Sequence, residues 1–510
     1  MKKILDKTEL FLNRIGQRLA PYFPPAVIST LMVFFVAIFL LFLPNYAGIA
    51  DNGTFSKLIY HSGLYPLKGY EQMYTNYFVR EYGILEYFNE TGLHWVSSQS
   101  IVVNLAVFLN KIFYSKTIFD LRCLALIYLG FYLGAIYLLT KALTIKSRTK
   151  MNYLIAVIIG FIFSDSDYLV YFQSFYPNAV ALISYIYMFS AGILLYRKMY
   201  SDKWLLLIYV SGAFFLLTLS AQYLFVVALS LIPIIMIGFM DTNISTRLLA
   251  MFAVLFLVIS GVLSYLFIPL SDSESRHFQA VSQGVLQVTQ QPKQGLEKME
   301  INPQYGVTKG DNYFDEYLPY DSQGTDVKDN LINRGNNLIL ISYYFTNPKE
   351  FKKALSKSMR MIYEVQDASL GNFEKSVGRA PGAKSSLFSF YSEVRRKSFP
   401  KTLGFLNLFF LLVVSLYMPG FIKSIYLKDI REGMRFMLVL IFYAIALLNL
   451  SVVTMTFGFN GISTHLFLVP LTLDLLLLLT VSEFFNKRLF KTRQEQLEQG
   501  KGDLLYEKVE

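Results

Sequence analysis

The stretch FIFSDSDYLVYFQSFYPNAVA, residues 161–181, ends one apolar run and begins the next. Between the two runs it carries two carboxylates, Asp165 and Asp167, and then a dense set of aromatic residues. Carboxylates are costly to place at a membrane boundary, which favours a functional site. A solvated turn that caps two helices, with its aromatic residues anchored at the interface, explains the same pattern. The rest of the chain has to separate these two interpretations.

The composition is that of a membrane protein. Of the 510 residues, 54% are hydrophobic and only 16% are charged, whereas about a quarter of an average soluble domain is charged. The net charge is +11, but the positive charge falls in short segments at helix ends, so we expect no nucleic acid as a partner. The single cysteine, Cys123, excludes an internal disulfide, and the four histidines show no metal-ligand spacing.

Ten apolar runs predict the fold, because a spanning helix needs about 20 mostly apolar residues. We therefore expect an all-α polytopic membrane protein, with Pro24 and Pro25 at the entry of its first span. The expected spans are residues 27–47, 122–143, 151–165, 178–196, 203–219, 222–240, 247–269, 403–425, 435–456 and 464–484.

Basic clusters predict the orientation of these spans. They fall in alternate loops, at residues 146–150, 197–203, 423–435 and 487–493, and residues 1–18 add further lysines and arginines. The positive-inside rule then predicts a multi-pass protein of the cell membrane with both termini in the cytoplasm.

This topology divides the chain into four parts. The expected parts are an N-terminal transmembrane module, residues 1–270, with external loops at 48–121 and 165–177; an external loop domain of mixed structure, 271–400; the C-terminal transmembrane helices, 401–486; and a cytoplasmic tail, 487–510.

Two amphipathic helices are expected outside the membrane. In residues 97–113, Ile101, Leu105 and Phe108 recur at helical spacing, which suits a helix on the outer membrane surface or one packed on the core of its own loop. The second helix begins at Asn347-Pro348. Its apolar face is predicted to be Phe351, Leu355, Met359 and Ile362.

Basic residues also precede the eighth span, on the side that the topology places outside. Arg395, Arg396, Lys397 and Lys401 oppose the usual charge bias there. A long translocated domain is exempt from that bias. The alternative is that these residues hold an anionic headgroup or a phosphate.

The residues that the topology places outside the membrane suit the transfer of a sugar from a lipid-linked donor. A carboxylate can take the proton from an acceptor hydroxyl, and an arginine or lysine can stabilise the departing phosphate. The rings of Tyr168, Tyr171 and Tyr176 suit a sugar or a prenyl chain. Arg276 and Arg379 are further phosphate-binding candidates, although both also read as ordinary loop residues. The same parts would serve a transporter or flippase of an anionic lipid.

Several short pieces resemble a known family. They are Asp51-Asn52-Gly53 with Phe55; SSQ…LN…FDLR between Ser97 and Arg122; the residues from Asp165 to Tyr176; Tyr343-Tyr344…Pro348; Leu370-Gly371-Asn372; and Phe399-Pro400. In their order and topology the chain resembles the GT-C class of membrane glycosyltransferases, in particular a bacterial hexose transferase family of surface-glycan biosynthesis.

The resemblance implies a polyprenyl-phosphate sugar as the donor lipid and a glycan acceptor outside the membrane. It implies that Asp51 is the catalytic base, although an aspartate before Asn-Gly also simply starts a turn. It implies a second acidic site residue, Asp165, with Asp167 as a further candidate. Transfer in this class is metal-independent, so no cofactor is expected, whereas Asp165-Ser166-Asp167 read alone as DxD would suit magnesium or manganese.

The sequence therefore predicts a membrane hexosyltransferase, with a flippase of a lipid-linked glycan as the alternative. A transporter should carry polar residues near the bilayer midplane, and Asn449 and Asp474 fall within two of the expected spans. Only the topology places Asp51 and Asp165 on one side of the membrane, so the sequence leaves open whether they share a pocket.

Overall fold

The computed structural model describes residues 23–86, 97–145, 148–241, 243–266, 270–315, 318–493 and 495. The basic residues of the first 18 positions, Lys146 and most of the expected cytoplasmic tail lie outside the described residues.

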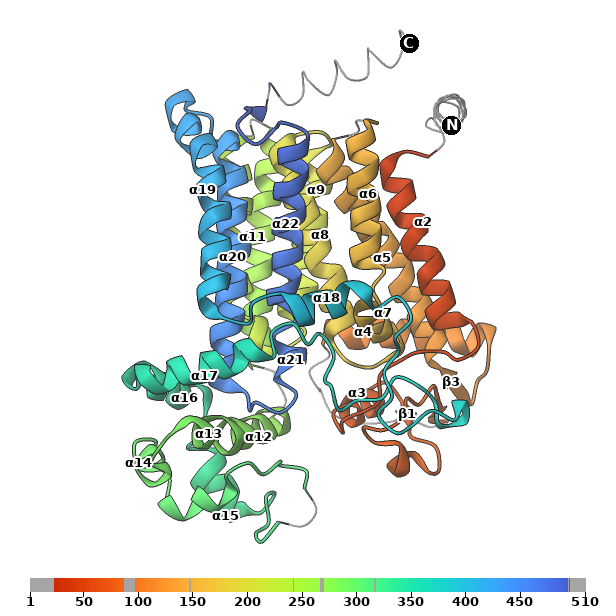
Figure 1. The fold of residues 1–510 in the computed structure, drawn as a ribbon, viewed down its shortest axis with the longest axis vertical. Helices are drawn as coiled ribbons and strands as arrows, with labels where there is room; N and C mark the ends of the chain where they lie inside the picture. The colour runs from red at the N-terminus through yellow and green to blue at the C-terminus, as the bar shows by residue number, and fades with distance from the viewer. Residues whose placement is uncertain are drawn as a thin grey trace, which may run out of the picture.

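Helices occupy the positions of all ten expected spans and stand side by side as a bundle (Figure 1), which confirms the all-α polytopic fold. Pro25 is the first residue of α2, the helix at the first expected span, as predicted. The helices are α2 (Pro25–Ala37) with its π-helical continuation η1 (Ile38–Phe42), α5 (Leu121–Thr144), α6 (Lys150–Phe163), α8 (Asn178–Arg197), α9 (Asp202–Leu217), α10 (Val226–Met240), α11 (Ile244–Leu266), α19 (Leu403–Leu427), α20 (Ile430–Thr456) and α22 (Leu468–Phe485).

Not all of these helices are long enough to span a bilayer alone. In the described residues, seven segments have the length and apolar composition: α2–η1, α5, α8, α11, α19, α20 and α22. An eighth is possible if α6 is joined to the short helices α7 (Ser166–Leu169) and η3 (Val170–Gln173), which bend away from it by 56°. The helices α9 and α10 have only 16 and 15 residues.

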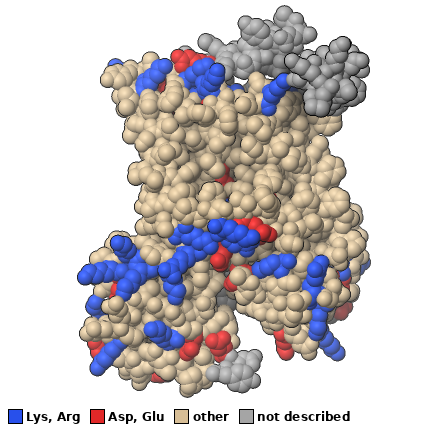
Figure 2. Space-filling model, viewed as in Figure 1, with Lys and Arg blue, Asp and Glu red and all other residues tan. Residues whose placement is uncertain are grey.

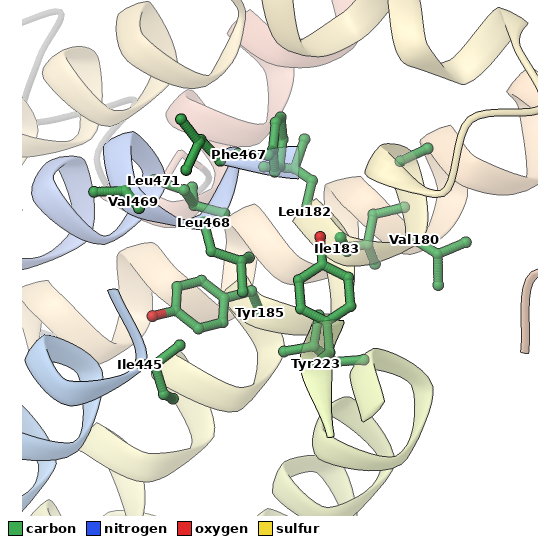
Figure 3. Packing of buried hydrophobic residues seen from close by; sticks show 14 of the residues in the cluster. Val180, Leu182, Ile183, Tyr185, Tyr223, Ile445, Phe467, Leu468, Val469 and Leu471 are labelled. Atoms are coloured by element: carbon green, nitrogen blue, oxygen red, sulfur yellow. The ribbon is translucent and has the colours of Figure 1, made fainter. Parts of the chain in front are cut away.

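The core of the bundle forms around α8, which is buried on nearly every side. A helix that is apolar all round is stable only inside a protein or a membrane. Figure 3 shows Tyr185 of α8 towards Ile445 of α20 and Leu468 of α22, with Ile183 beside Tyr223. The Tyr185 hydroxyl lies 2.7 Å from the Thr472 hydroxyl, so the buried phenol is satisfied.

The two ends of the bundle differ. We call the end at which α2 begins and α22 ends the terminal end, and the opposite end the loop end (Figure 1). Figure 2 shows some lysines and arginines at the terminal end and a larger group of them at the loop end. The turns between α8 and α9 and between α19 and α20 lie there, so these basic clusters share one side, as predicted.

Buried ion pairs tie the helices together at the terminal end. The Glu483 carboxylate in α22 accepts from Arg197 of α8 at 2.6 Å and from Arg435 of α20 at 2.8 Å. Asp202 of α9 pairs with Arg431 of α20 at 2.7 Å. Four helices therefore depend on two buried carboxylates, both of which are almost fully withdrawn from solvent.

The first loop forms a small three-stranded antiparallel sheet that the sequence did not reveal. It contains α3 (Phe55–His61), β1 (Leu64–Tyr65), η2 (Tyr70–Met73), β2 (Glu81–Ile84), α4 (Ser98–Phe113) and β3 (Ile118–Asp120), with strand order β1-β2-β3.

Helix α4 is the amphipathic helix expected at residues 97–113. Val103, Ala106 and Val107 are buried, whereas Ile101, Leu105 and Phe108 are exposed. The exposed apolar side does not pack on the core of its own loop and is available to a membrane surface. This favours a helix on the outer membrane surface over a helix packed on the loop core.

The third loop contains only helices and irregular segments among its described residues, apart from a single bridge between Ala47 and Phe373, instead of the expected mixed structure. Its elements are α12 (Leu270–Gln279), η5 (Ala280–Val285), α13 (Leu286–Val288), α14 (Pro292–Glu297), η6 (Pro303–Thr308), α15 (Thr325–Val327), η7 (Lys328–Ile332), α16 (Asn337–Thr346), α17 (Pro348–Arg360), η8 (Lys375–Val377) and α18 (Phe390–Ser398). Two short helices, η4 (Ala221–Tyr223) and α21 (Ile462–His465), complete the fold.

Helix α17 begins where the sequence predicts and buries much of the predicted face, but it ends at Arg360, before Ile362 of that face. Pro348 is its first residue, and Leu355 and Met359 are buried while Phe351 is partly buried. Asn347 makes no side-chain cap; its amide instead donates to the carbonyl of Tyr343 at 2.8 Å.

Candidate functional site

The first and third loops meet directly beside Asp51. The Gly48 N–H donates to the carbonyl of Asn372 at 3.0 Å, and the Ala50 N–H donates to that of Gly371 at 2.9 Å. The Asn372 side-chain amide returns a bond of 2.7 Å to the Gly48 carbonyl. A Cβ on Gly371 would stand 2.0 Å from the backbone oxygen of Asn76, so only glycine allows this approach.

The Asp51 carboxylate is buried and fully engaged. Its Oδ1 accepts from the N–H groups of Gly53 at 2.8 Å and Phe55 at 3.1 Å, which forms the turn that starts α3. Its Oδ2 accepts from the Tyr70 hydroxyl at 2.9 Å. Burial raises the pKa of Asp51 above the usual carboxyl value, although these hydrogen bonds oppose the shift.

Two tyrosines connect the second loop to the other two. The Tyr176 hydroxyl donates to the carbonyl of Ala50 and accepts from the N–H of Asn52, both at 3.1 Å. Its ring centroid lies 6.1 Å from that of Tyr171, whose hydroxyl donates to the Val365 carbonyl at 2.6 Å. These predicted binding residues therefore hold the walls of the site together.

Asp165 holds two helices in place. Its Oδ1 accepts from the Asp167 N–H at 2.9 Å and caps α7, and its Oδ2 accepts from the Ser392 N–H of α18, also at 2.9 Å. Both oxygens are thus bound to backbone. Burial, together with the neighbouring Asp167 charge, raises the pKa of Asp165 to about 6.

This shift predicts a pH dependence of stability. Between about pH 4 and pH 6 the folded protein keeps a proton on Asp165 that the unfolded chain releases, so stability falls as pH rises through this window, by about 3 kcal/mol. Asp165→Asn should remove that slope, which denaturation of both proteins in detergent across this pH range would measure. Parallel curves for wild type and variant would contradict the assignment.

Asp167 carries a carboxylate oxygen that is not engaged. Its Oδ1 accepts from the Gln366 amide at 2.8 Å, and Gln366 Oε1 accepts from Asn372 at 3.0 Å. The other oxygen, Oδ2, is buried and accepts no hydrogen bond from any described residue. Through Gln366 and Asn372 the carboxylate is connected to the segment that ends in Asp51. We call the hydrogen-bonded residues Asp167, Gln366 and Asn372, together with the Gly48 backbone that leads to Asp51, the acidic network.

Sequence reasoning missed two charged residues at this site, Asp367 and Lys384. The Lys384 ammonium donates to the Asp367 carbonyl, and burial lowers the pKa of Lys384 to about 8 against the opposing charges of Asp167 and Asp367. The charges of Asp51 and Asp367 both act on the Tyr176 hydroxyl. Neither missed residue falls in a periodic segment, although Leu370-Gly371-Asn372 and Arg379, which were singled out from the sequence, lie between them.

Arg395 and Tyr168 lie in a buried cluster with Asp474. Arg395 Nη1 donates to Asp474 at 2.7 Å and to the Tyr168 hydroxyl at 3.0 Å, and the Tyr168 hydroxyl donates to the same carboxylate at 2.7 Å. The Tyr391 hydroxyl donates to its other oxygen. Two guanidinium nitrogens of Arg395, Nε and Nη2, make no hydrogen bond within the described structure. The cluster fastens α18 to α22.

The remaining predicted arginines lie in separate surroundings. Arg379 is exposed, 5.7 Å over the ring of Phe373. Arg276 lies 5.7 Å over the ring of Phe457, which packs at 4.1 Å on His465. Arg396 is partly buried and acts electrostatically on Lys384.

Across the described ranges, no group of three or more His, Cys, Asp or Glu side chains could hold a metal ion. Asp120, the last residue of β3, pairs with Arg122 at 2.7 Å and caps α5.

Comparison with known proteins identifies one similarity. Residues 10–502 match the family described as the YfdI N-terminal transmembrane domain. No curated protein and no solved structure matches the chain.

Proposed function

Because the chain belongs to the YfdI N-terminal transmembrane domain family, which it matches over nearly its whole length, we propose that it is a membrane glycosyltransferase. The proposed reaction moves a hexose from a polyprenyl-phosphate donor to a cell-envelope glycan at the loop end, which we place outside the cell. The observation that carries this proposal is the acidic network, which runs from Asp167 of the second loop to the backbone of Gly48, three residues before Asp51 in the first loop.

Asp51 is the proposed general base. It takes the proton of an acceptor hydroxyl as that oxygen attacks the anomeric carbon, and the bond between this carbon and the phosphate oxygen breaks. The polyprenyl phosphate leaves with the bonding electrons. Burial supports the role because it moves the pKa of Asp51 towards neutral pH, where a base is most effective.

The second loop supplies the supporting carboxylates. Asp165 positions α7 and α18, since both of its oxygens are bound to backbone N–H groups. Asp167 is the better partner for a sugar hydroxyl, because its Oδ2 is buried and unengaged among the described residues.

Lys384 is the proposed partner of the departing phosphate, with Arg396 beside it. Arg395 suits this role less well, because it is already bound to Asp474 and Tyr168. A cation near the leaving oxygen stabilises the negative charge that develops there. The reaction needs no metal in this scheme.

Lys384 gives this scheme a pH dependence. Since its pKa is about 8, the ammonium is lost as pH rises to 9, and the KM for the donor should rise roughly tenfold. Lys384→Arg keeps the charge and should hold the KM constant from pH 7 to pH 9. The same rise in both proteins would remove Lys384 from the phosphate site.

A flippase of lipid-linked glycan is the second candidate. One observation that favours it is Asn449, which is fully buried in α20 and whose side-chain nitrogen and oxygen make no hydrogen bond to described residues. The other is the buried Asp474 within α22. Polar side chains inside a bundle mark the paths of transported molecules.

A reconstituted assay separates the two candidates. The purified chain in lipid vesicles would receive a panel of radiolabelled polyprenyl-phosphate hexoses and crude envelope glycan, with and without chelator. Label on the glycan, insensitive to chelator, is the expected result. Movement of intact labelled lipid across the bilayer without transfer, for every donor, would support the flippase instead.

A further inference from the structure

A basic groove lies on the third loop, outside the acidic network. It has a volume of about 610 Å³ and runs along α17 where α13 approaches it. Its lining residues are Gln287, Val288, Lys349, Lys352, Lys353, Ser356, Lys357 and Arg360.

Every charged residue that lines the groove is positive. The five cations are spaced three, four, eight and eleven residues after Lys349, so they share one face of the helix. The one acidic residue of α17, Glu350, does not line the groove; it accepts from the Tyr343 hydroxyl. Burial and the nearby charge of Lys309, which does not line the groove, lower the pKa of Lys357. An anion in the groove would offset the positive charge that the five cations concentrate there.

The opposite face of α17 is fixed to the bundle. Leu355 and Met359 are buried, and Ser358 Oγ accepts from the Thr454 hydroxyl of α20 at 2.8 Å. The helix therefore cannot turn its cations inward without breaking these contacts.

The groove lies where the bundle meets the loops. Figure 1 shows α17 lying across the loop end, directly beyond α19 and α20, and Figure 2 shows lysines and arginines over this helix and over α18. The lipid-facing side of α19 exposes Leu408 and Leu411. On α16, which precedes α17, Leu338 and Phe345 are about three-quarters exposed, at 75% and 76%.

We propose that this groove binds the phosphate headgroup of an anionic phospholipid from the leaflet at the loop end. Lysines and arginines at a membrane surface attract anionic lipids, and the exposed apolar residues of α16 and α19 offer contacts to acyl chains that a soluble anion would not use. The groove shares no lining residue with the acidic network, so this lipid is distinct from the proposed donor.

Lipid selectivity of the full chain tests the proposal. The protein would be reconstituted in phosphatidylcholine vesicles, and spin-labelled phosphatidylglycerol would report its association with the protein relative to labelled phosphatidylcholine. We expect association to be several-fold stronger for phosphatidylglycerol. The combined change Lys349→Gln, Lys352→Gln, Lys353→Gln and Arg360→Gln should abolish most of that preference.

Two matched variants control for loss of charge and of fold. Four exposed lysines outside the groove, Lys68, Lys116, Lys293 and Lys375, changed together to Gln, should leave the preference intact. Changing Lys349, Lys352 and Lys353 to Arg and Arg360 to Lys keeps the charge and should preserve the preference too.

Three results would overturn the proposal. One is an undiminished preference in the groove variant. Another is displacement of the labelled lipid by millimolar inorganic phosphate, which would indicate a site for soluble anions. The third is displacement by polyprenyl phosphate at a far lower concentration than by phosphatidylglycerol, which would assign the groove to the donor.

Discussion

Replacing Asp51 by Asn is expected to lower the rate of hexosyl transfer by at least about 100-fold, the usual contribution of a general base. An asparagine oxygen can still accept from the N–H groups of Gly53 and Phe55, so the turn that starts α3 should persist. The side chain can no longer take a proton. The loss should therefore appear in transfer and not in folding, which initial rates and thermal unfolding of the same preparation would separate.

A second aspartate offers a matched control. Asp321 is exposed, and its carboxylate accepts from the N–H of Gln323 in the same kind of turn. Asp321→Asn should transfer at the wild-type rate. Equal rates for Asp51→Asn and wild type would remove Asp51 from the chemistry and would leave Asp167, with its unengaged oxygen, as the next candidate.

Replacing Glu483 by Gln is expected to destabilise the protein by about 3–5 kcal/mol, because it leaves the buried Arg197 without a counter-charge and Arg435 with only the more distant Glu432, at 3.9 Å. Each Glu483 oxygen receives a different arginine, Arg197 at 2.6 Å and Arg435 at 2.8 Å, and all three side chains are almost fully buried. The change weakens the ion pairs that connect α22 to α8 and α20. Equilibrium unfolding in mixed detergent micelles would measure it.

An exposed glutamate provides the comparison. Glu393 pairs with Lys397 at 3.2 Å on the surface of α18, where solvent screens the interaction. Glu393→Gln should leave the unfolding transition unchanged. If Glu483→Gln were equally harmless, the terminal end would not depend on its buried ion pairs.

The sequence predicted the apolar part of this fold well. Runs of apolar residues placed helices at all ten expected positions, and the periodic spacing of Leu355 and Met359 predicted the buried face of α17. These features are local, because a helix repeats its environment every three to four residues. The lengths of the apolar runs did not show that helices α9 and α10 would be too short to span a bilayer on their own.

The polar contacts could not be predicted in the same way. Asp474 and Arg395 are 79 residues apart, and Asn372 and Gly48 are 324 apart. No local pattern reports such pairs. The sequence therefore suggested Asp51, Asp165 and Asp167 as site residues, but not that Asp165 would be bound to backbone on both oxygens, or that Lys384 would lie beside Asp167.

The most direct test of hexosyl transfer is a balance of products in vesicles that contain only this chain, a labelled polyprenyl-phosphate hexose and envelope glycan. Labelled hexose on the glycan should equal the polyprenyl phosphate released, mole for mole, and both should disappear with Asp51→Asn. If every donor in the panel remained intact, with no label on the glycan at any time, the chain would not be the transferase proposed here.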